Sequence, residues 1–538
     1  MMKSIKNFSV LVLSCIVVVF SFSACTAEDD IIQQAPSAFN NINYDDVVSD
    51  AMVTASGIMK VDVDQRSRTR GADGEAQSGN VSVTNITEAE ANAILEREAS
   101  KKESSAISMY QWVTLNYRCK TADGSIKELS ELVAWPYMNI FFKGINPTAK
   151  QLVIGCHSTI TSNAERPSNF TNMSSATETN MLALFANGLS QKALVIIPDY
   201  EGYGSTANIP HPYCNRELTA EQVVTGVKAG LRYYEKNVKT MDPNWSSVAI
   251  GYSQGGAVAA GVLRYCQEHG ETSLRLKGAV CGDGPYDPMA TLKRYIEMDK
   301  LYMPVAPALL MKGAIDTDPD MIANGCKYED FVTDKFFETG IFDMIRDKKE
   351  STDDIQANLL RHSLKHGDKG GFTMRAQTKE GFLPYTERNL KDARGKKRSF
   401  ELENGKGYNY CTVDQCFKPG VIEYFRNGTI VGDVPEAKLK ALEKALTKNA
   451  LTAGGFKPGK GFTFFHSIGD EVVPYCNYES VRNTWGVNSI QSNSYHSNTT
   501  LHVATGTSFF LDYCGGMVDE ILKDKWEARD KNIGGRLW

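Results

Sequence analysis

The sequence has no excess of positive charge and no internal repeat. Its 538 residues include 59 Lys and Arg against 64 Asp and Glu, for a formal net charge of −5. This balance provides no general electrostatic attraction to nucleic acid or to an anionic membrane surface, so neither is expected as a partner. The missing repeat argues against solenoids and propellers. With 42% hydrophobic residues, the chain is still able to bury a large core.

Metal-binding patterns are also absent. None of the 12 cysteines belongs to a CxxC pair, and no group of Cys and His has the spacing of zinc ligands. Cys411 and Cys416 are the closest pair after the leader. They either form a disulfide in an oxidising compartment or are small buried residues, as most of the others would be. We therefore expect no metal and no organic cofactor.

One long apolar run opens the chain. Two lysines precede an apolar stretch from residue 8 to residue 22, and small residues stand directly before Cys25. This order resembles the lipobox of bacterial lipoproteins, which implies that 1–24 is a signal peptide and Cys25 a lipid anchor. An ordinary secretory peptide and a transmembrane anchor are the alternatives, although the run is short for a membrane span. The expected location is the bacterial cell envelope, at the outer membrane, facing the periplasm or the surface.

The chain then divides into segments of different character. Residues 25–85 are expected to form a disordered tether, because the stretch 65–75 is polar, contains glycine and lacks an apolar period. A hairpin is expected over 112–136, with a turn near Gly124. Short apolar runs alternating with helical patterns follow, and they indicate parallel βαβ units of an α/β fold. The runs lie at 151–156, 193–198, 247–250 and 276–281.

Strand patterns stop near residue 288 and return at 462–466. This predicts a catalytic domain formed by 86–287 and 456–538, interrupted by a mainly helical cap over 288–455. The cap contains an apolar run from Leu301 to Met311 whose two prolines argue against one unbroken helix. That run either forms the core of the cap or faces a pocket, where Met303 and Leu310 would accept an acyl chain.

Gly251–Gly256 reads Gly-Tyr-Ser-Gln-Gly-Gly and fits the pattern G-x-S-x-G. A predicted strand precedes it and a helix rich in small residues follows, which is the context of a nucleophile elbow rather than of a plain strand–helix turn. Ser253 is therefore the candidate nucleophile. The backbone N–H of Gln254 is expected to bind an oxyanion, with a second donor from the loop at His157 and Ser158.

A serine nucleophile needs a base, and the base needs an orienting acid. Asp470 follows a strand beside a glycine turn and is the preferred acid; Asp283, after the preceding strand, is its rival. Only two histidines come later in the chain. His502 directly precedes a helical stretch and is the preferred base, whereas His496 stands in a polar loop.

Neighbouring polar residues receive supporting roles. His466 is expected to hold the Asp470 loop by hydrogen bonds, and Glu471 to be solvated. His211 and Tyr213 follow a predicted strand on the expected active-site side of the sheet, so they are candidates to line the pocket.

These segments together resemble the α/β-hydrolase superfamily, and they are most similar to its secretory lipase group of esterases. The elbow at 251–256, the strand end Pro198–Gly204 and the turn at Asp470 carry the resemblance, which covers about residues 107 to 525 apart from most of the cap. It implies a mostly parallel sheet flanked by helices, with a lid inserted before the acid-bearing strand. It also implies Ser253, Asp470 and His502 as catalytic residues.

The activity implied is cleavage of carboxylic esters through an acyl-enzyme, with a small-molecule, lipid or polysaccharide ester as substrate. Three alternatives stay open. They are a serine peptidase, an esterase that removes acetyl or feruloyl groups from polysaccharide, and a non-catalytic surface binding protein on a hydrolase fold.

Overall fold

The structure is a computed structural model, and it describes residues 51–63, 81–99, 108–137, 148–172, 193–378, 381–391, 394–396, 409–495 and 502–534. The predicted signal peptide, Cys25, most of the predicted tether and His496 lie outside these ranges.

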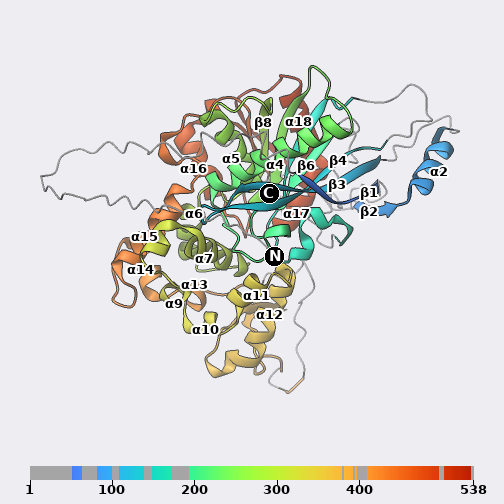
Figure 1. The fold of residues 1–538 in the computed structure, drawn as a ribbon. Helices are drawn as coiled ribbons and strands as arrows, with labels where there is room; N and C mark the ends of the chain where they lie inside the picture. The colour runs from blue at the N-terminus through green and yellow to red at the C-terminus, as the bar shows by residue number, and fades with distance from the viewer. Residues whose placement is uncertain are drawn as a thin grey trace, which may run out of the picture. The chain divides into compact units, whose positions relative to one another are not determined.

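An 11-stranded sheet runs through the described part of the chain (Figure 1). One edge is antiparallel and contains, in order, β2 (Val81–Ile86), β1 (Met52–Val63), β3 (Ser108–Lys120) and β4 (Ile126–Pro136). The sheet continues with parallel strands in the order β6 (Ala193–Pro198), β5 (Gln151–Cys156), β7 (Ser246–Tyr252), β8 (Leu276–Gly282), β11 (Phe462–Ser467), β12 (Gln491–Tyr495) and β13 (Arg529–Gly534). The hairpin and the apolar strands predicted from the sequence are present.

The predicted tether is wrong where it covers β1 and β2. β1 pairs with β3 on one side and with β2 on the other, so its backbone groups are bonded in both directions. Met59 is fully buried and packs in the same cluster as Trp112. Both strands carry an alternating pattern, in which Met59, Val61 and Val63 are separated by Lys60 and Asp62, and Val81 and Val83 by Ser82. The tether prediction overlooked this pattern because it was based on the polar stretch between the two strands.

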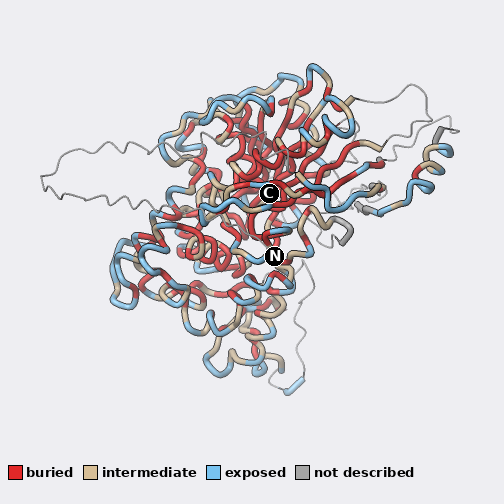
Figure 2. Tube along the Cα trace, viewed as in Figure 1, coloured by how far each residue is buried: buried red, intermediate tan, exposed pale blue. Residues whose placement is uncertain are grey.

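Alternate residues of the parallel strands point to opposite faces of the sheet. Leu152, Ile154 and their equivalents pack against α4 (Arg216–Asn237), α5 (Gln254–Glu268) and α16 (Cys476–Trp485). Val153, Val248 and their equivalents pack against the segment formed by α17 (His502–Ser508), the π-helix η9 (Phe509–Tyr513) and α18 (Cys514–Leu522). Both faces are covered, and the sheet is the most deeply buried part of the molecule in Figure 2.

The chain leaves the sheet after β8 and returns at β11, and the intervening residues form the cap. Its helices are α6 (Pro288–Met298), α7 (Val305–Thr317), α8 (Pro319–Ala323), α9 (Tyr328–Phe331), α10 (Asp334–Phe337), α11 (Ile341–Asp347), α12 (Thr352–His366), α13 (Val413–Cys416), α14 (Pro419–Asn427) and α15 (Glu436–Lys448). They enclose a hydrophobic cluster of their own, and they are the yellow and orange helices of Figure 1. A short hairpin of β9 (Arg375–Thr378) and β10 (Gly381–Pro384) also lies in the cap, and the sequence pattern missed it.

Three smaller features complete the description. Helix α2 (Glu88–Ala99) begins with a capping box, since Thr87 and Glu90 exchange side-chain and backbone hydrogen bonds. Cys411 and Cys416 are free thiols whose Sγ atoms lie 3.4 Å apart, and both are buried in the cap. Within the residues described, no helix is both long enough and apolar enough to span a bilayer.

Candidate active site

The turn between β7 and α5 holds Ser253 in a strained conformation. Its φ is +58° and its ψ is −128°, a combination that side-chain-bearing residues rarely adopt. A Cβ added to Gly251 would lie 2.1 Å from the carbonyl oxygen of Gly255, and one added to Gly255 would lie 2.0 Å from that of Cys156. The two glycines of the pattern are therefore required because backbone approaches backbone at this turn.

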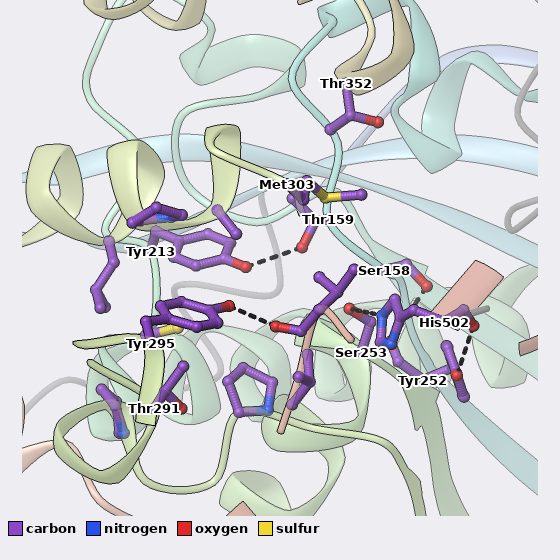
Figure 3. A pocket seen from close by; sticks show the side chains of 18 of the residues that line it. Ser158, Thr159, Tyr213, Tyr252, Ser253, Thr291, Tyr295, Met303, Thr352 and His502 are labelled. Atoms are coloured by element: carbon purple, nitrogen blue, oxygen red, sulfur yellow. Dashed lines mark hydrogen bonds between the residues drawn. The ribbon is translucent and has the colours of Figure 1, made fainter. Parts of the chain in front are cut away.

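Ser253, His502 and Asp470 form one hydrogen-bonded chain, although they come from three separate parts of the sequence. The Oγ of Ser253 lies 2.9 Å from Nε2 of His502 (Figure 3), and Nδ1 of His502 lies 2.5 Å from Oδ2 of Asp470. His502 and Asp470 are buried, whereas Ser253 keeps partial exposure. The structure thus brings together the three residues that the sequence selected.

The loop after β11 holds the Asp470 carboxylate in place. Its Oδ1 accepts hydrogen bonds from the backbone N–H groups of Val472 (2.8 Å) and Val473 (2.7 Å), which leaves Oδ2 for His502. His466 donates from Nε2 to the carbonyl of Val473 (3.3 Å), in the supporting role expected of it. One oxygen of the acid therefore orients the loop and the other orients the imidazole.

Glu471 is not the solvated neighbour that the sequence suggested. Its carboxylate accepts the backbone N–H of His502, at 3.0 and 3.2 Å, at the N-terminus of α17. Burial and the adjacent Asp470 raise the pKa of Glu471 to about 7. Burial alone would lower the pKa of His502, but Asp470 outweighs it and raises that pKa to about 9. The surrounding acids therefore favour the imidazolium that forms when the histidine accepts a proton.

The rival acid, Asp283, lies near the same histidine but does not bond to its ring. It accepts the backbone N–H of Ser467 at 2.6 Å, and its other oxygen lies 2.7 Å from the Tyr252 hydroxyl. Oxygens of Asp283 and Asp470 and a ring nitrogen of His502 all lie within 4.8 Å of one another. Of the two acids, Asp470 is the one in hydrogen-bond contact with the imidazole. The rival base His496 lies outside the described residues.

Two backbone segments meet beside Ser253. Gln254 is the first residue of α5, so its N–H has no acceptor within the helix. Ser158, in the loop after β5, lines the pocket, and its hydroxyl donates to the carbonyl of Tyr252 (3.1 Å). The His157 side chain is buried away from the pocket: its ring nitrogens lie 2.7 Å from the Ser158 carbonyl and 3.0 Å from that of Asp199. Of His157, only the backbone remains a candidate for the oxyanion site.

A cavity opens above Ser253, between the sheet and the cap (Figure 3). No Asp, Glu, Lys or Arg is among the described residues that line it. The lining residues are Ser158, Thr159, Tyr213, Cys214, Tyr252, Ser253, Pro285, Pro288, Thr291, Tyr295, Met303, Ala306, Pro307, Leu310, Thr352, Val472, Val473, His502 and Val503. Its apolar wall, with a few polar groups close to Ser253, is typical of a pocket for a small molecule.

Only one of the two predicted pocket residues reaches this cavity. Tyr213 lines it, and its hydroxyl is hydrogen-bonded to Thr159 (3.0 Å). His211 is not a pocket residue: it is buried behind the elbow, where its Nδ1 donates to the carbonyl of Glu201 and its Nε2 accepts from the Gln254 side chain. Burial lowers the pKa of His211 to about 3, so this ring is neutral and serves to fix Gln254.

The apolar run 301–311 contributes both to the core of the cap and to the wall of the cavity. Leu301, Val305 and Leu309 are buried in the core of the cap, while Met303 and Leu310 face the cavity and are partly buried. α7 begins only after Pro304, in agreement with the expected break. The sequence had no signal for Tyr295 and Thr352, because both enter the pocket from cap segments without a recognisable motif. The Tyr295 hydroxyl donates to the carbonyl of Val472, so it has no further proton to give to a ligand.

No family model and no curated protein matches the sequence. Solved structures share its fold. An esterase from Xanthomonas oryzae, LipA, described as rice cell wall degrading, superposes with a TM-score of 0.56 at 15% identity, covering 88% of this chain and 99% of its own. A provisionally assigned hydrolase from Legionella pneumophila gives a TM-score of 0.53 at 16% identity, covering 81% and 95%. The chain therefore has the α/β-hydrolase fold, as the resemblance in its sequence implied.

Proposed function

We propose that the chain is a serine hydrolase that cleaves carboxylic esters. The observation that carries this proposal is the hydrogen-bonded chain from Ser253 Oγ through His502 to Asp470. A base in contact with a hydroxyl, itself oriented by a buried carboxylate, is the arrangement that activates a serine for attack on a carbonyl. The strained turn at Ser253 supports the same role, since strain of this kind gathers at functional sites.

In the proposed reaction, Ser253 attacks the ester carbonyl while Nε2 of His502 accepts the hydroxyl proton. Asp470 keeps the other imidazole proton on Nδ1 and stabilises the imidazolium. His502 then gives its proton to the leaving alcohol, and an acyl-enzyme forms on Ser253. Water, deprotonated by the same histidine, releases the acid and restores the serine.

The negative oxygen of the tetrahedral intermediate needs donors in a fixed position. The N–H of Gln254 is one, supported by its place as the first residue of α5, where the helix dipole also favours negative charge. The loop at His157 and Ser158 would supply the second. Because His211 fixes the Gln254 side chain and Ser158 is bonded to Tyr252, both segments are held in place before substrate arrives.

The cavity supports an ester whose acyl part is uncharged and apolar. Its wall holds no Asp, Glu, Lys or Arg among the described residues, and the hydroxyls of Tyr213 and Tyr295 are already bonded to protein. A charged acyl group would lose its hydration there without a partner. Met303 and Leu310 form part of this wall and can adapt to groups of different shape.

The test combines labelling with a substrate panel. A fluorophosphonate probe should label the wild type and leave the Ser253→Ala variant unlabelled, which separates a serine hydrolase from a binding protein. p-Nitrophenyl esters of increasing acyl length, a peptide amide and an acetylated xylan then separate an esterase, a peptidase and a polysaccharide esterase. Failure of the wild type to react with the probe, or hydrolysis by Ser253→Ala at the wild-type rate, would refute the proposal.

We also propose that Cys25 anchors the protein by lipid in the bacterial cell envelope. The support is the sequence alone, namely small residues directly before Cys25 at the end of the apolar run. The Cys25→Ser variant should move from the membrane fraction to the soluble fraction, and mass spectrometry of the wild type should find an acylated Cys25. A wild type without lipid mass would overturn the anchor.

A further inference from the structure

A second hydrogen-bonded chain lies behind the histidine and joins Asp283, Tyr252 and the backbone of His502. The Tyr252 hydroxyl oxygen lies 2.7 Å from Oδ2 of Asp283 and 2.7 Å from the carbonyl oxygen of His502. Figure 3 shows the second of these contacts. All three groups are buried.

The number of available protons determines which groups in this hydrogen-bonded chain donate and which accept. A tyrosine hydroxyl has one proton to donate, a backbone carbonyl only accepts, and an ionised carboxylate also only accepts. If Asp283 were ionised, Tyr252 could satisfy only one of its two acceptors. Both short contacts are hydrogen bonds at once when Asp283 carries a proton, donates it to the Tyr252 oxygen, and Tyr252 donates in turn to the His502 carbonyl.

The surroundings of Asp283 agree with a neutral carboxyl group. Its Oδ1 accepts the N–H of Ser467, so Oδ2 is the oxygen that holds the proton. The Asp470 carboxylate and the His502 ring face it, and the nearest other ring, His466, lies 3.6 Å from Oδ1. Burial lowers the pKa of His466 to about 4, so that ring is neutral. Burial, with the repulsion of Asp470, raises the pKa of Asp283 to about 8.

We propose that Asp283 and Tyr252 are positioning residues, with a proton on Oδ2 of Asp283, and that they hold the backbone of His502 so that its Nε2 stays on Ser253. The proposal rests on the function proposed for Ser253 and His502. Glu471 holds the N–H of His502 and Tyr252 holds its carbonyl, so both peptide groups flanking the ring are fixed. Asp283 itself has a φ of +36°, in the left-handed region that favours glycine, so its carboxyl group is held in place at the cost of backbone strain.

Three substitutions test the proton count. Asp283→Asn keeps an acceptor for Ser467 and a donor for Tyr252, so kcat should stay within about 3-fold of the wild type. Asp283→Leu and Tyr252→Phe both leave the His502 carbonyl without an oriented donor. Each should lower kcat roughly 5- to 100-fold, the range for an unpaired buried acceptor, with KM nearly unchanged. The double variant should lose no more than the worse single variant, because the two residues act as one unit.

Tyr286→Phe is the matched control. Its hydroxyl is equally buried and donates to a strand carbonyl, that of Cys281 at 2.9 Å, but it lies outside the chain to His502. This variant should keep the wild-type kcat even if its melting temperature falls. A loss of kcat in Tyr286→Phe equal to that of Tyr252→Phe would reduce the role of Tyr252 to general packing and overturn the proposal.

The pH dependence distinguishes a neutral from an ionised Asp283. The wild type should lose kcat at alkaline pH. An ionised Asp283 accepts the hydrogen bond of the Tyr252 hydroxyl, which then no longer donates to the His502 carbonyl. Asp283→Asn should keep its kcat there. Below the pH at which Asp283 ionises, the kcat of the two proteins should change with pH in parallel, because a neutral amide there replaces a neutral acid. An Asp283→Asn profile displaced to lower pH in that range would show that a negative charge beside His502 had been removed, and a kcat as low as that of Asp283→Leu would also refute the neutral acid.

Infrared difference spectroscopy gives a readout that does not depend on activity. The wild type minus Asp283→Asn spectrum at neutral pH should contain the carbonyl band of a protonated carboxylic acid. Only carboxylate bands in that spectrum would refute the proposal, whether or not the protein hydrolyses esters. If the band is present but the wild type does not react with a fluorophosphonate, the function proposed for Ser253 has failed and the protonated Asp283 has not.

Discussion

Replacing Asp470 by asparagine should disable His502 while leaving the fold intact. In the structure, Oδ1 of Asp470 accepts two backbone N–H groups and Oδ2 lies 2.5 Å from Nδ1 of His502. Only the amide oxygen of an asparagine can accept those two N–H groups, so its NH₂ must face Nδ1. The imidazole proton would then move to Nε2 and point at Ser253, which removes the base.

The size of the effect follows from this change of tautomer. A triad with the wrong tautomer loses about 10⁴-fold in kcat, equivalent to roughly 5 kcal/mol at about 1.4 kcal/mol per tenfold. The melting temperature should change by only a few degrees, because the loop keeps its two backbone hydrogen bonds. The assay is single-turnover hydrolysis of a p-nitrophenyl ester, with the rate of fluorophosphonate labelling as a second measure.

Asp343→Asn is the control, since among the described residues this exposed acid pairs with Arg346, and Arg346 also pairs with its neighbour Asp347. Surface pairs of this kind contribute little, so activity should be unchanged. Retention of more than about a tenth of the activity by Asp470→Asn would refute the argument from tautomers. The orienting acid would then have to be sought elsewhere, beginning with Asp283.

Three further predictions concern pH, substrate length and stability. Asp470 raises the pKa of His502 to about 9, and the catalytic base must be neutral, so kcat/KM should rise with pH with an apparent pKa above the ordinary histidine value of about 6.5. An apparent pKa below that value would contradict the effect of Asp470 on His502. Leu310→Glu places a charge in the pocket wall, so it should raise KM about 10-fold for long-chain esters and leave KM for acetyl esters unchanged. Ile322→Glu, on the exposed surface of the cap, should change neither KM. Equal losses of activity on both esters in Leu310→Glu would mean that Leu310 only belongs to the core of the cap. Both carboxyl oxygens of Glu131 are buried without a partner, and burial raises its pKa well above the ordinary range, so the folded protein keeps a proton that the unfolded chain loses above about pH 4.3. Stability should therefore fall as pH rises, and Glu131→Leu should weaken that dependence in thermal melts; an unchanged dependence would refute it.

The sequence alone was sufficient for the features that depend on local constraints. The elbow could be found because a serine held between β7 and α5 needs glycine two residues before and two after it, where backbone meets backbone. The parallel strands β5, β6, β7, β8 and β11 could be found because each is buried on both faces and is mostly apolar, whereas the polar strands β12 and β13 gave no such signal. The limits of the cap could be predicted because the apolar strand pattern stops after β8 and returns only at β11.

Tertiary structure decided what depends on contacts between distant segments. Asp283 and Asp470 follow β8 and β11, which are adjacent parallel strands, so both acids reach the same edge of the sheet. Only the turn after each strand determines which carboxylate meets His502 and which meets Tyr252. In the same way, β1 is a strand because β3 and β2 lie on either side of it, and Tyr295 is a pocket residue because the cap folds over Ser253. The choice between the two acids and the place of Tyr295 leave no local pattern, since the energy that selects these contacts comes from partners that are far away in the chain.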